Sequence, residues 1–252
     1  MDGLKLRFKK RVDSIKNLKN SFKELKWYEI IMIVIMVFIA GLAVYKAIVN
    51  PTSTTSPLWL TLVNFVSAVC GIICIFFCAK ANVSNFIFGL VNTVVYAIYL
   101  LYYKIYGTFC LEVLFYLPMN IASWINWARH RDKKMPEKTM AKHLTIKQHI
   151  ISVIGVLVTI FVTYEILVRV GGTVAFLDAL TVAIGIVATI LELYRYAEQY
   201  IWWIITDIIA VIMYIVHFDT VYLTKKTIYL IMAIIGLRNW IKLNKERNKK
   251  NV

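Results

Sequence analysis

Residues 191–217 read LELYRYAEQYIWWIITDIIAVIMYIVH, an apolar stretch of helical length that also carries carboxylates and large aromatic rings. At helical spacing, Tyr200, Trp203 and Asp207 fall on one face of this segment. A carboxylate at membrane depth is costly unless it faces a polar cavity or a partner. The pattern therefore predicts a helix that forms one wall of a wet, aromatic-lined permeation path.

The composition of the whole chain is that of a membrane protein. Of its 252 residues 60% are hydrophobic and the mean hydropathy is +0.68. Its apolar runs of roughly 20 residues are long enough to cross a bilayer. We therefore expect an all-α polytopic membrane protein with eight transmembrane helices, near residues 29–48, 58–79, 83–104, 107–127, 147–168, 174–194, 199–217 and 221–241.

Basic residues are concentrated in a few places. The net charge is +15, and 22 of the 29 Lys and Arg lie in residues 1–28, 128–147 and 238–252. Such clusters are explained by membrane topology, in which basic residues stay inside, so we expect no nucleic-acid binding and place both termini in the cytoplasm. Apolar residues at intervals of three or four in residues 4–26 predict a basic amphipathic helix on the membrane surface.

The cysteine, histidine and motif patterns argue against a metal site or an enzyme. Cys70, Cys74 and Cys78 repeat every four residues along one predicted helix, without the His or second Cys pair that a thiolate metal site needs. The sequence contains no His-Glu-x-x-His, no Gly-x-Ser-x-Gly and no phosphate-binding glycine loop. We expect no cofactor, no metal and no catalytic activity.

An internal repeat is the most informative feature of the chain. Polar and aromatic positions recur at a shift of 113 to 115 residues: Asn64 with Asp178, Asn85 with Gln199, Asn92 with Asp207, and Trp127 with Trp240. The charge distribution makes both copies begin outside and end inside, so they are expected to be parallel. Parallel repeats with a substrate held between them describe one class of secondary transporter.

The repeat and the charge distribution divide the chain into six predicted segments. They are a cytoplasmic basic amphipathic segment (1–28), an extra N-terminal transmembrane helix and loop (29–57), a first three-helix bundle (58–127), a cytoplasmic linker with a linker helix (128–170), a second three-helix bundle (171–241) and a cytoplasmic basic tail (242–252).

Polar residues recur at intervals of three or four along the repeated helices, and in hydrocarbon the polar side of a helix faces inward. Asn64 marks such a face in residues 58–79, and Asn85, Asn92 and Tyr96 mark one in residues 83–104. These faces are expected to converge on a shared cavity. The alternative for any single residue is that it hydrogen-bonds to a neighbouring helix.

Three blocks carry a resemblance to a known family: NFIFGLVNTVVYAIYLLYYKIYG (85–107), LFYLPMN (114–120) and LDALTVAIGIVATILELYRYAEQYIWWIITDIIAVIMYI (177–215). They resemble the PnuC nicotinamide riboside transporters of bacteria, over roughly residues 58–243. The resemblance implies two parallel three-helix bundles joined by a linker helix, as in SWEET sugar transporters, with the vitamin bound between them. It also implies facilitated diffusion across the cytoplasmic membrane and trapping by phosphorylation. The sequence leaves open whether the protein is a monomer or a homotrimer.

The pocket of that family carries a Trp-x-x-Trp motif, whose positions here are Tyr200 and Trp203, so a tyrosine replaces the first tryptophan. A flat cationic ring, as in nicotinamide riboside or thiamine, is well held by aromatic faces beside a carboxylate. Thiamine transport and ion coupling through a buried carboxylate both remain open. The candidate substrate-binding residues are Tyr200, Trp203, Asp207, Asn92, Asn64, Gln199, Tyr96 and Asn85.

Overall fold

The computed structural model describes residues 18–23, 25–49, 57–104, 106–133, 135–170, 175–216 and 220–249. These residues form helices and short connections with three isolated β-bridges and no strand, which confirms the all-α prediction for this part of the chain. Most of the amphipathic helix predicted at residues 4–26 lies outside the described residues.

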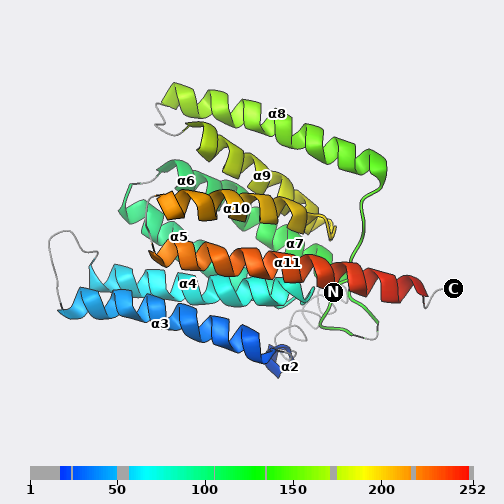
Figure 1. The fold of residues 1–252 in the computed structure, drawn as a ribbon, viewed down its shortest axis with the longest axis horizontal. Coiled ribbons are helices and arrows are strands. Elements are labelled where there is room, and N and C mark those ends of the chain that lie inside the picture. The colour runs from blue at the N-terminus through cyan, green and yellow to red at the C-terminus, as the bar shows by residue number, and fades with distance from the viewer. Residues whose placement is uncertain are drawn as a thin grey trace, which may run out of the picture. The chain divides into compact units, whose positions relative to one another are not determined.

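The chain divides into two compact units, Met1–Thr139 and Met140–Val252. The first contains α2 (Leu18–Lys23), α3 (Trp27–Val49), α4 (Leu58–Ala79), α5 (Asn85–Tyr102), α6 (Tyr106–Leu111), the π-helix η1 (Glu112–Tyr116) and α7 (Leu117–Arg129). The second contains α8 (Ile146–Val170), α9 (Ala175–Leu193), α10 (Gln199–Val216) and α11 (Thr220–Lys249), as Figure 1 shows.

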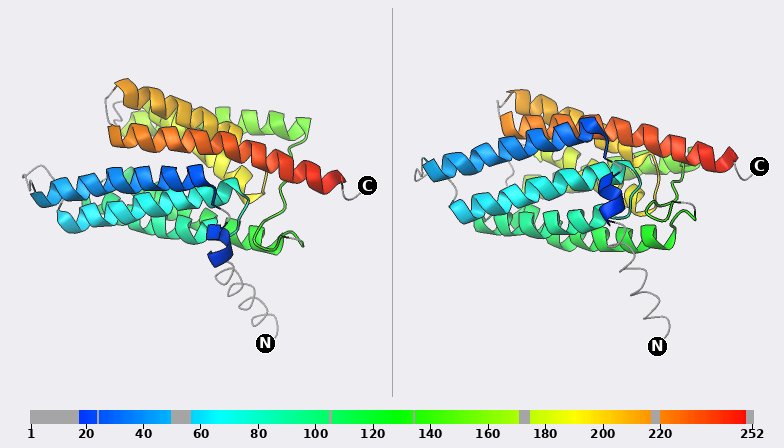
Figure 2. Two further views of the ribbon diagram at one scale, coloured as in Figure 1. Left: turned by 60° about the horizontal axis from the view of Figure 1, so that its bottom comes forward. Right: turned by 90° about the horizontal axis from the view of Figure 1, so that it is seen from below.

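In the first unit, α3 packs along α4, α4 along α5, and α5 against α7 (Figure 2). The core is apolar, and Ile72, Phe76 and Phe86 are fully buried in it. At Gly89 on α5 an added Cβ would lie 2.9 Å from Oδ1 of Asn120 and 3.3 Å from Sγ of Cys74. The absence of a side chain at Gly89 therefore lets α5 approach α4 and α7 closely.

Helical structure runs through the whole span predicted at residues 107–127, but its hydrogen-bonding pattern changes within the span. A π-helical turn, η1, separates α6 from α7, and Pro118 is the second residue of α7. Proline has no N–H, and its ring clashes with the carbonyl four residues earlier, so the helix before it must widen or bend. In the second unit, Met232 and Ala233 occupy the aligned region and α11 runs unbroken.

In the second unit, α8 packs along α9, α9 against α10, and α10 against α11. Val156 of α8 forms a buried cluster with Ile184, Val187 and Leu191 of α9. The hydroxyl of Thr163 on α8 donates to the carbonyl of Ala179 on α9 at 3.3 Å. Most other large apolar side chains of α8 are exposed, as in a helix that faces lipid.

The α4–α5 and α9–α10 turns share an unusual backbone geometry. Ala81 and Arg195, which lie 114 residues apart, have φ angles of 57° and 67°. In each turn the carbonyl of this residue accepts from the chain that follows α7: Thr139 N donates to Ala81 at 2.8 Å, and Lys142 N donates to Arg195 at 2.8 Å. The predicted repeat is therefore present in the backbone of both units.

Several helices have the length and composition of membrane spans. In the described residues, Trp27–Lys46, Leu58–Ala79, Asn85–Tyr102 and Ile146–Ile166 are long and apolar enough to cross a bilayer. Ala179–Leu193 and Gln199–Ile212 are shorter apolar helices. The protein is therefore a multi-pass membrane protein, and the number of eight spans stays a prediction.

Candidate functional site

The aromatic and acidic face of α10 is built by helical spacing. Tyr200, Trp203 and Asp207 lie three and then four residues apart, so their side chains leave α10 on the same side. Asp207 is 4% exposed, whereas Trp203 is only partly buried. This face therefore combines an indole that retains exposed surface with a buried carboxylate one turn away.

Asp207 is paired with a lysine of the next helix. Nζ of Lys226 on α11 donates to Oδ1 of Asp207 at 3.0 Å, and the exposed fractions of the two side chains are 25% and 5%. Nζ of Lys226 also lies 5.5 Å from the ring centroid of Tyr229. A buried carboxylate beside apolar helices needs such compensation, because desolvation of a lone charge is expensive. The α10–α11 contact thus contains a neutralised acid.

Tyr200 is held by packing within the second unit. Its side chain is 4% exposed, and its ring meets that of Trp240 on α11 edge-to-face, with centroids 5.8 Å apart. Its ring also fills the space beside Gly236, where an added Cβ would lie 2.5 Å from Cε1 of Tyr200. These contacts suffice to explain why an aromatic residue stands at position 200.

Gln199 is the first residue of α10 and is fully buried. Neither Oε1 nor Nε2 of its amide has a hydrogen-bond partner among the described residues. An unsatisfied buried amide is expensive, so a native protein retains one where a ligand or water completes it. Gln199 thus offers one donor and one acceptor that the protein itself does not use.

The repeat-equivalent residue of the first unit, Asn85, is the first residue of α5 and is also fully buried. Its Nδ2 donates to the carbonyl of Asn82 at 3.0 Å. Its Oδ1 is a buried acceptor that pairs with nothing in the described part of the chain. The two units therefore place a buried amide with spare hydrogen-bonding capacity at the same position.

The remaining candidates lie on α4 and α5 and differ in their surroundings. Oδ1 of Asn92 accepts from the hydroxyl of Ser67 at 2.8 Å, which joins α5 to α4. Tyr96 is partly buried and its ring stacks on that of Tyr99, with centroids 6.0 Å apart. Asn64 is an exposed residue of α4. Asn92 and Tyr96 are thus engaged within the first unit, and Asn64 is accessible.

Lys226 and Asn120 are polar residues that the sequence patterns did not single out. Lys226 lies in the second turn of α11. Nδ2 of Asn120 on α7 donates to the hydroxyl of Thr93 on α5 at 3.4 Å. Thr93 lies at helical spacing from Asn85, Gly89 and Tyr96, and this spacing is the signal that could have identified Thr93.

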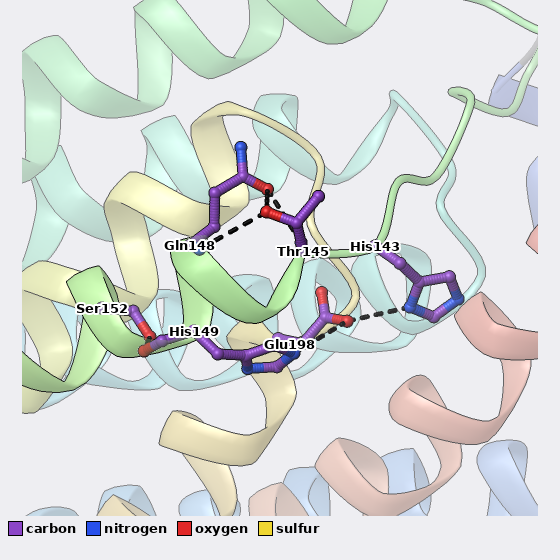
Figure 3. Close-up of polar contacts among 6 residues, drawn as sticks. All are labelled: His143, Thr145, Gln148, His149, Ser152 and Glu198. Atoms are coloured by element: carbon purple, nitrogen blue, oxygen red, sulfur yellow. Dashed lines mark hydrogen bonds and ion pairs between the residues drawn. The ribbon is translucent and has the colours of Figure 1, made fainter.

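A second polar cluster joins the segment before α8 to the α9–α10 turn (Figure 3). Oε1 of Glu198 lies 2.9 Å from Nδ1 of His143 and 4.0 Å from Nε2 of His149. At the start of α8, the hydroxyl of Thr145 donates to Oε1 of Gln148 at 3.2 Å and accepts from the backbone N–H of Gln148 at 3.4 Å. In the described residues no group of three or more His, Cys, Asp or Glu is arranged to hold a metal ion. These contacts therefore connect the segment before α8 to the α9–α10 turn.

Known proteins resemble this chain over most of its length. Residues 61–242 match the family described as nicotinamide mononucleotide transporter. A protein of Neisseria mucosa named nicotinamide riboside transporter PnuC is 31% identical over 217 residues, which cover 82% of this chain and 80% of that protein. The chain belongs to the PnuC family of transporters.

Other PnuC proteins agree with this assignment. The nicotinamide riboside transporter PnuC of Haemophilus influenzae is 30% identical over 75% of this chain and 82% of its own length. The PnuC protein of Escherichia coli is 24% identical over 76% of this chain and 90% of its own length. A crystal structure of the vitamin B3 transporter PnuC is similar in fold, with a TM-score of 0.69, 29% identity, and coverage of 88% of this chain and 94% of that chain.

Proposed function

We propose that this PnuC-family protein carries nicotinamide riboside into bacterial cells across the cytoplasmic membrane. The main support is similarity over nearly the whole chain: 82% of it aligns with a relative named nicotinamide riboside transporter, at 31% identity. The α10 face adds a chemical argument, because a cationic pyridinium ring is well held by an indole and a carboxylate. Trp203 and Asp207 offer that pair of groups.

The proposed architecture follows from the sequence repeat. Eight helices cross the bilayer, with residues 58–127 and 171–241 as parallel three-helix bundles, a linker helix between them and both termini in the cytoplasm. Substrate binds in a central cavity between the bundles, near the membrane midplane, as in secondary transporters built from parallel repeats. Transport is by facilitated diffusion, and phosphorylation in the cytoplasm traps the riboside.

The roles of the candidate residues differ in this proposal. Trp203 stacks on the ring and Asp207 balances its charge, whereas the buried amides of Gln199 and Asn85 recognise the carboxamide or the ribose hydroxyls. A carboxamide presents one acceptor and two donors, which the spare acceptor and donor of Gln199 complement. Asn92, Asn64 and Tyr96 complete the proposed contacts to the substrate, and Tyr200 belongs to the set as the residue whose packing on Trp240 positions α10.

The substrate is identified by a binding panel on the purified full-length protein. A ligand that binds the folded state raises the temperature of thermal unfolding. Nicotinamide riboside is expected to do so, and nicotinamide mononucleotide, riboflavin and thiamine are expected to have little effect. Stabilisation by thiamine alone would assign the protein to another cationic vitamin. Light scattering of the same sample distinguishes a monomer of 29.2 kDa from a homotrimer.

Two substitutions test the proposed residues. Trp203→Ala and Asp207→Ala are expected to abolish stabilisation by nicotinamide riboside while the proteins still insert and run as one species in gel filtration. Trp59→Ala is the matched control, because Trp59 is 50% exposed on α4 and packs edge-to-face on Tyr102. Full-affinity binding by both test variants would show that the substrate-binding site lies elsewhere in the protein.

Uptake into reconstituted vesicles tests facilitated diffusion. Under this mechanism, labelled nicotinamide riboside equilibrates across the vesicle membrane and does not accumulate, whether or not a proton gradient is imposed. Accumulation above the external concentration that stops when an ionophore collapses the gradient would establish ion coupling instead.

A further inference from the structure

Asp207 already has a positively charged partner before any substrate arrives. Nζ of Lys226 lies 3.0 Å from Oδ1 of Asp207, and the carboxylate side chain is only 5% exposed. The adjacent Lys225 places its Nζ 5.6 Å from the ring centroid of Tyr229. The acid on the aromatic face of α10 is thus neutralised by a residue of the protein itself.

At the equivalent position of the repeat, the first unit has an uncharged residue. Asn92, which the repeat aligns with Asp207, accepts a hydrogen bond from Ser67 at 2.8 Å. A neutral amide needs no counter-ion, whereas a buried carboxylate does. The charged pair is therefore a property of the second unit alone, and its two members come from helices that pack directly on each other, α10 and α11.

Charge balance decides how a cation can use this site. A cationic ring placed beside the intact Asp207–Lys226 pair would leave one uncompensated positive charge in a desolvated region, which is strongly unfavourable. If the lysine withdraws, the ring replaces it and the site stays neutral. The side chain of Lys226 is 25% exposed and therefore has access to more polar surroundings, where its ammonium group is better solvated.

We propose that Lys226 is a tethered counter-ion that a cationic substrate displaces from Asp207, and that it sets how strongly the carrier prefers a charged ring over a neutral one. This inference rests on the proposed function, because it takes the cationic riboside as the substrate and Asp207 as part of its site. The lysine lowers affinity by competing for the carboxylate, and its return to Asp207 assists release of the substrate.

The test compares two ligands that differ in ring charge. Nicotinamide riboside carries a positive ring, and its reduced 1,4-dihydro form has the same ribose and carboxamide on a neutral ring. Calorimetric titration of the full-length protein in nanodiscs gives both affinities. Lys226→Met is expected to raise the affinity for nicotinamide riboside about fivefold, the equivalent of one partly exposed ion pair, and to change the affinity for the reduced form little.

Control variants separate charge competition from packing. Lys225→Met removes a neighbouring lysine that lies against the same Tyr229 but makes no direct ion pair with Asp207, so it should raise the affinity for nicotinamide riboside much less than Lys226→Met does. Lys226→Arg keeps the competing charge and should not raise the affinity for nicotinamide riboside. Because Lys226→Met removes the counter-ion of a buried acid and can destabilise the protein, the uncharged double variant Asp207→Asn/Lys226→Met is made as well. Because it lacks the carboxylate, it should bind nicotinamide riboside more weakly than the parent does, and its preference for the charged ring over the neutral ring should shrink.

The outcomes distinguish this inference from the proposed function. Unchanged or weakened binding of nicotinamide riboside by Lys226→Met, an equal gain for both ligands, or a double variant with the parent's charge preference would each overturn the counter-ion role while nicotinamide riboside remained the substrate. A parent protein that binds neither ligand would refute the proposed function and this inference together.

Discussion

Tyr200 on α10 packs edge-to-face on Trp240 of α11, with ring centroids 5.8 Å apart and ring planes inclined at 69°. In the first unit Phe86 and Trp127 make the same kind of contact, at 4.8 Å and 84°. These pairs occupy equivalent positions of the sequence repeat, 114 and 113 residues apart. One aromatic pair therefore joins the start of α5 to α7 in the first unit, and an equivalent pair joins the start of α10 to α11 in the second unit.

Gly236 is expected to be essential for this contact. In Gly236→Ala the new Cβ would lie 2.5 Å from the Tyr200 ring, which Trp240 prevents from moving away. Forcing an extra methyl group into a packed core costs about 1–3 kcal/mol, so the unfolding temperature in detergent should fall. Gly155→Ala is the control, because no heavy atom lies within 4 Å of its added Cβ. Its unfolding temperature should stay the same or rise slightly.

A tryptophan in place of Tyr200 is expected to destabilise the protein. An indole is larger than a phenol ring, and the space around Tyr200 is already filled by Trp240 and Gly236. Tyr200→Trp should therefore lower the unfolding temperature without raising the affinity for nicotinamide riboside. Tyr200→Phe keeps the ring and should bind as the parent does, as Phe86 fills the equivalent position. Tighter binding by a stable tryptophan variant would instead place residue 200 against the substrate.

Removal of one member of the Glu29–Lys80 pair is expected to destabilise the first unit strongly. Lys80 Nζ donates to Glu29 Oε2 at 2.6 Å, and the two side chains are 8% and 1% exposed. The same oxygen accepts from Lys26 N at 2.8 Å, at the start of α3. Removing one member of a buried pair costs about 3–5 kcal/mol, so Glu29→Gln should lower the unfolding temperature markedly.

Two further variants make that measurement specific. Glu246→Gln breaks an exposed pair with Lys242, whose charged atoms are 3.8 Å apart, and should leave stability unchanged. The double variant Glu29→Gln/Lys80→Met removes both charges and should recover part of the loss, because the buried ammonium group that has lost its carboxylate is removed as well. Equal stability of Glu29→Gln and the parent protein would show that other groups or water compensate the charge of Lys80.

The sequence predicted the features that depend on composition and periodicity. Helical periodicity gave the helices, and the repeat of 114 residues gave the equivalence of the two turns, in which Ala81 and Arg195 share a positive φ. Family membership followed from three blocks of sequence, and the comparisons confirm it. These features are local or averaged over many residues, so single contacts do not decide them.

The sequence did not predict features that depend on one contact. Lys226 is opposite Asp207 because about 14 Å of α10 lies beyond Asp207 and about 9 Å of α11 precedes Lys226, so the hairpin brings them together. A count of basic residues per loop carries no such information. Helical spacing likewise predicted the face of α10 on which Tyr200 lies. It did not predict whether that face contacts a neighbouring helix or lines a polar cavity.

Substitution of Gln199 most clearly separates an effect on folding stability from an effect on substrate binding. Its amide is fully buried, and Oε1 and Nε2 find no hydrogen-bond partner in the described part of the chain. Each unsatisfied group costs about 1–3 kcal/mol, and methionine has a similar volume without these groups. Gln199→Met is therefore expected to raise the unfolding temperature of the ligand-free protein and to abolish further stabilisation by nicotinamide riboside.

Gln148→Met is the matched control for that experiment. Oε1 of Gln148 accepts from Thr145 N at 2.9 Å, and its Nε2 donates to the hydroxyl of Tyr196 at 3.2 Å, so both amide atoms are used within the protein. Loss of the Gln148 amide should lower the stability of the protein or leave that stability unchanged, and it should not affect binding of nicotinamide riboside. A fall in unfolding temperature for Gln199→Met with binding intact would show that this amide supports the fold. The opposite pattern, a more stable protein that no longer responds to the vitamin, is what a group reserved for substrate produces.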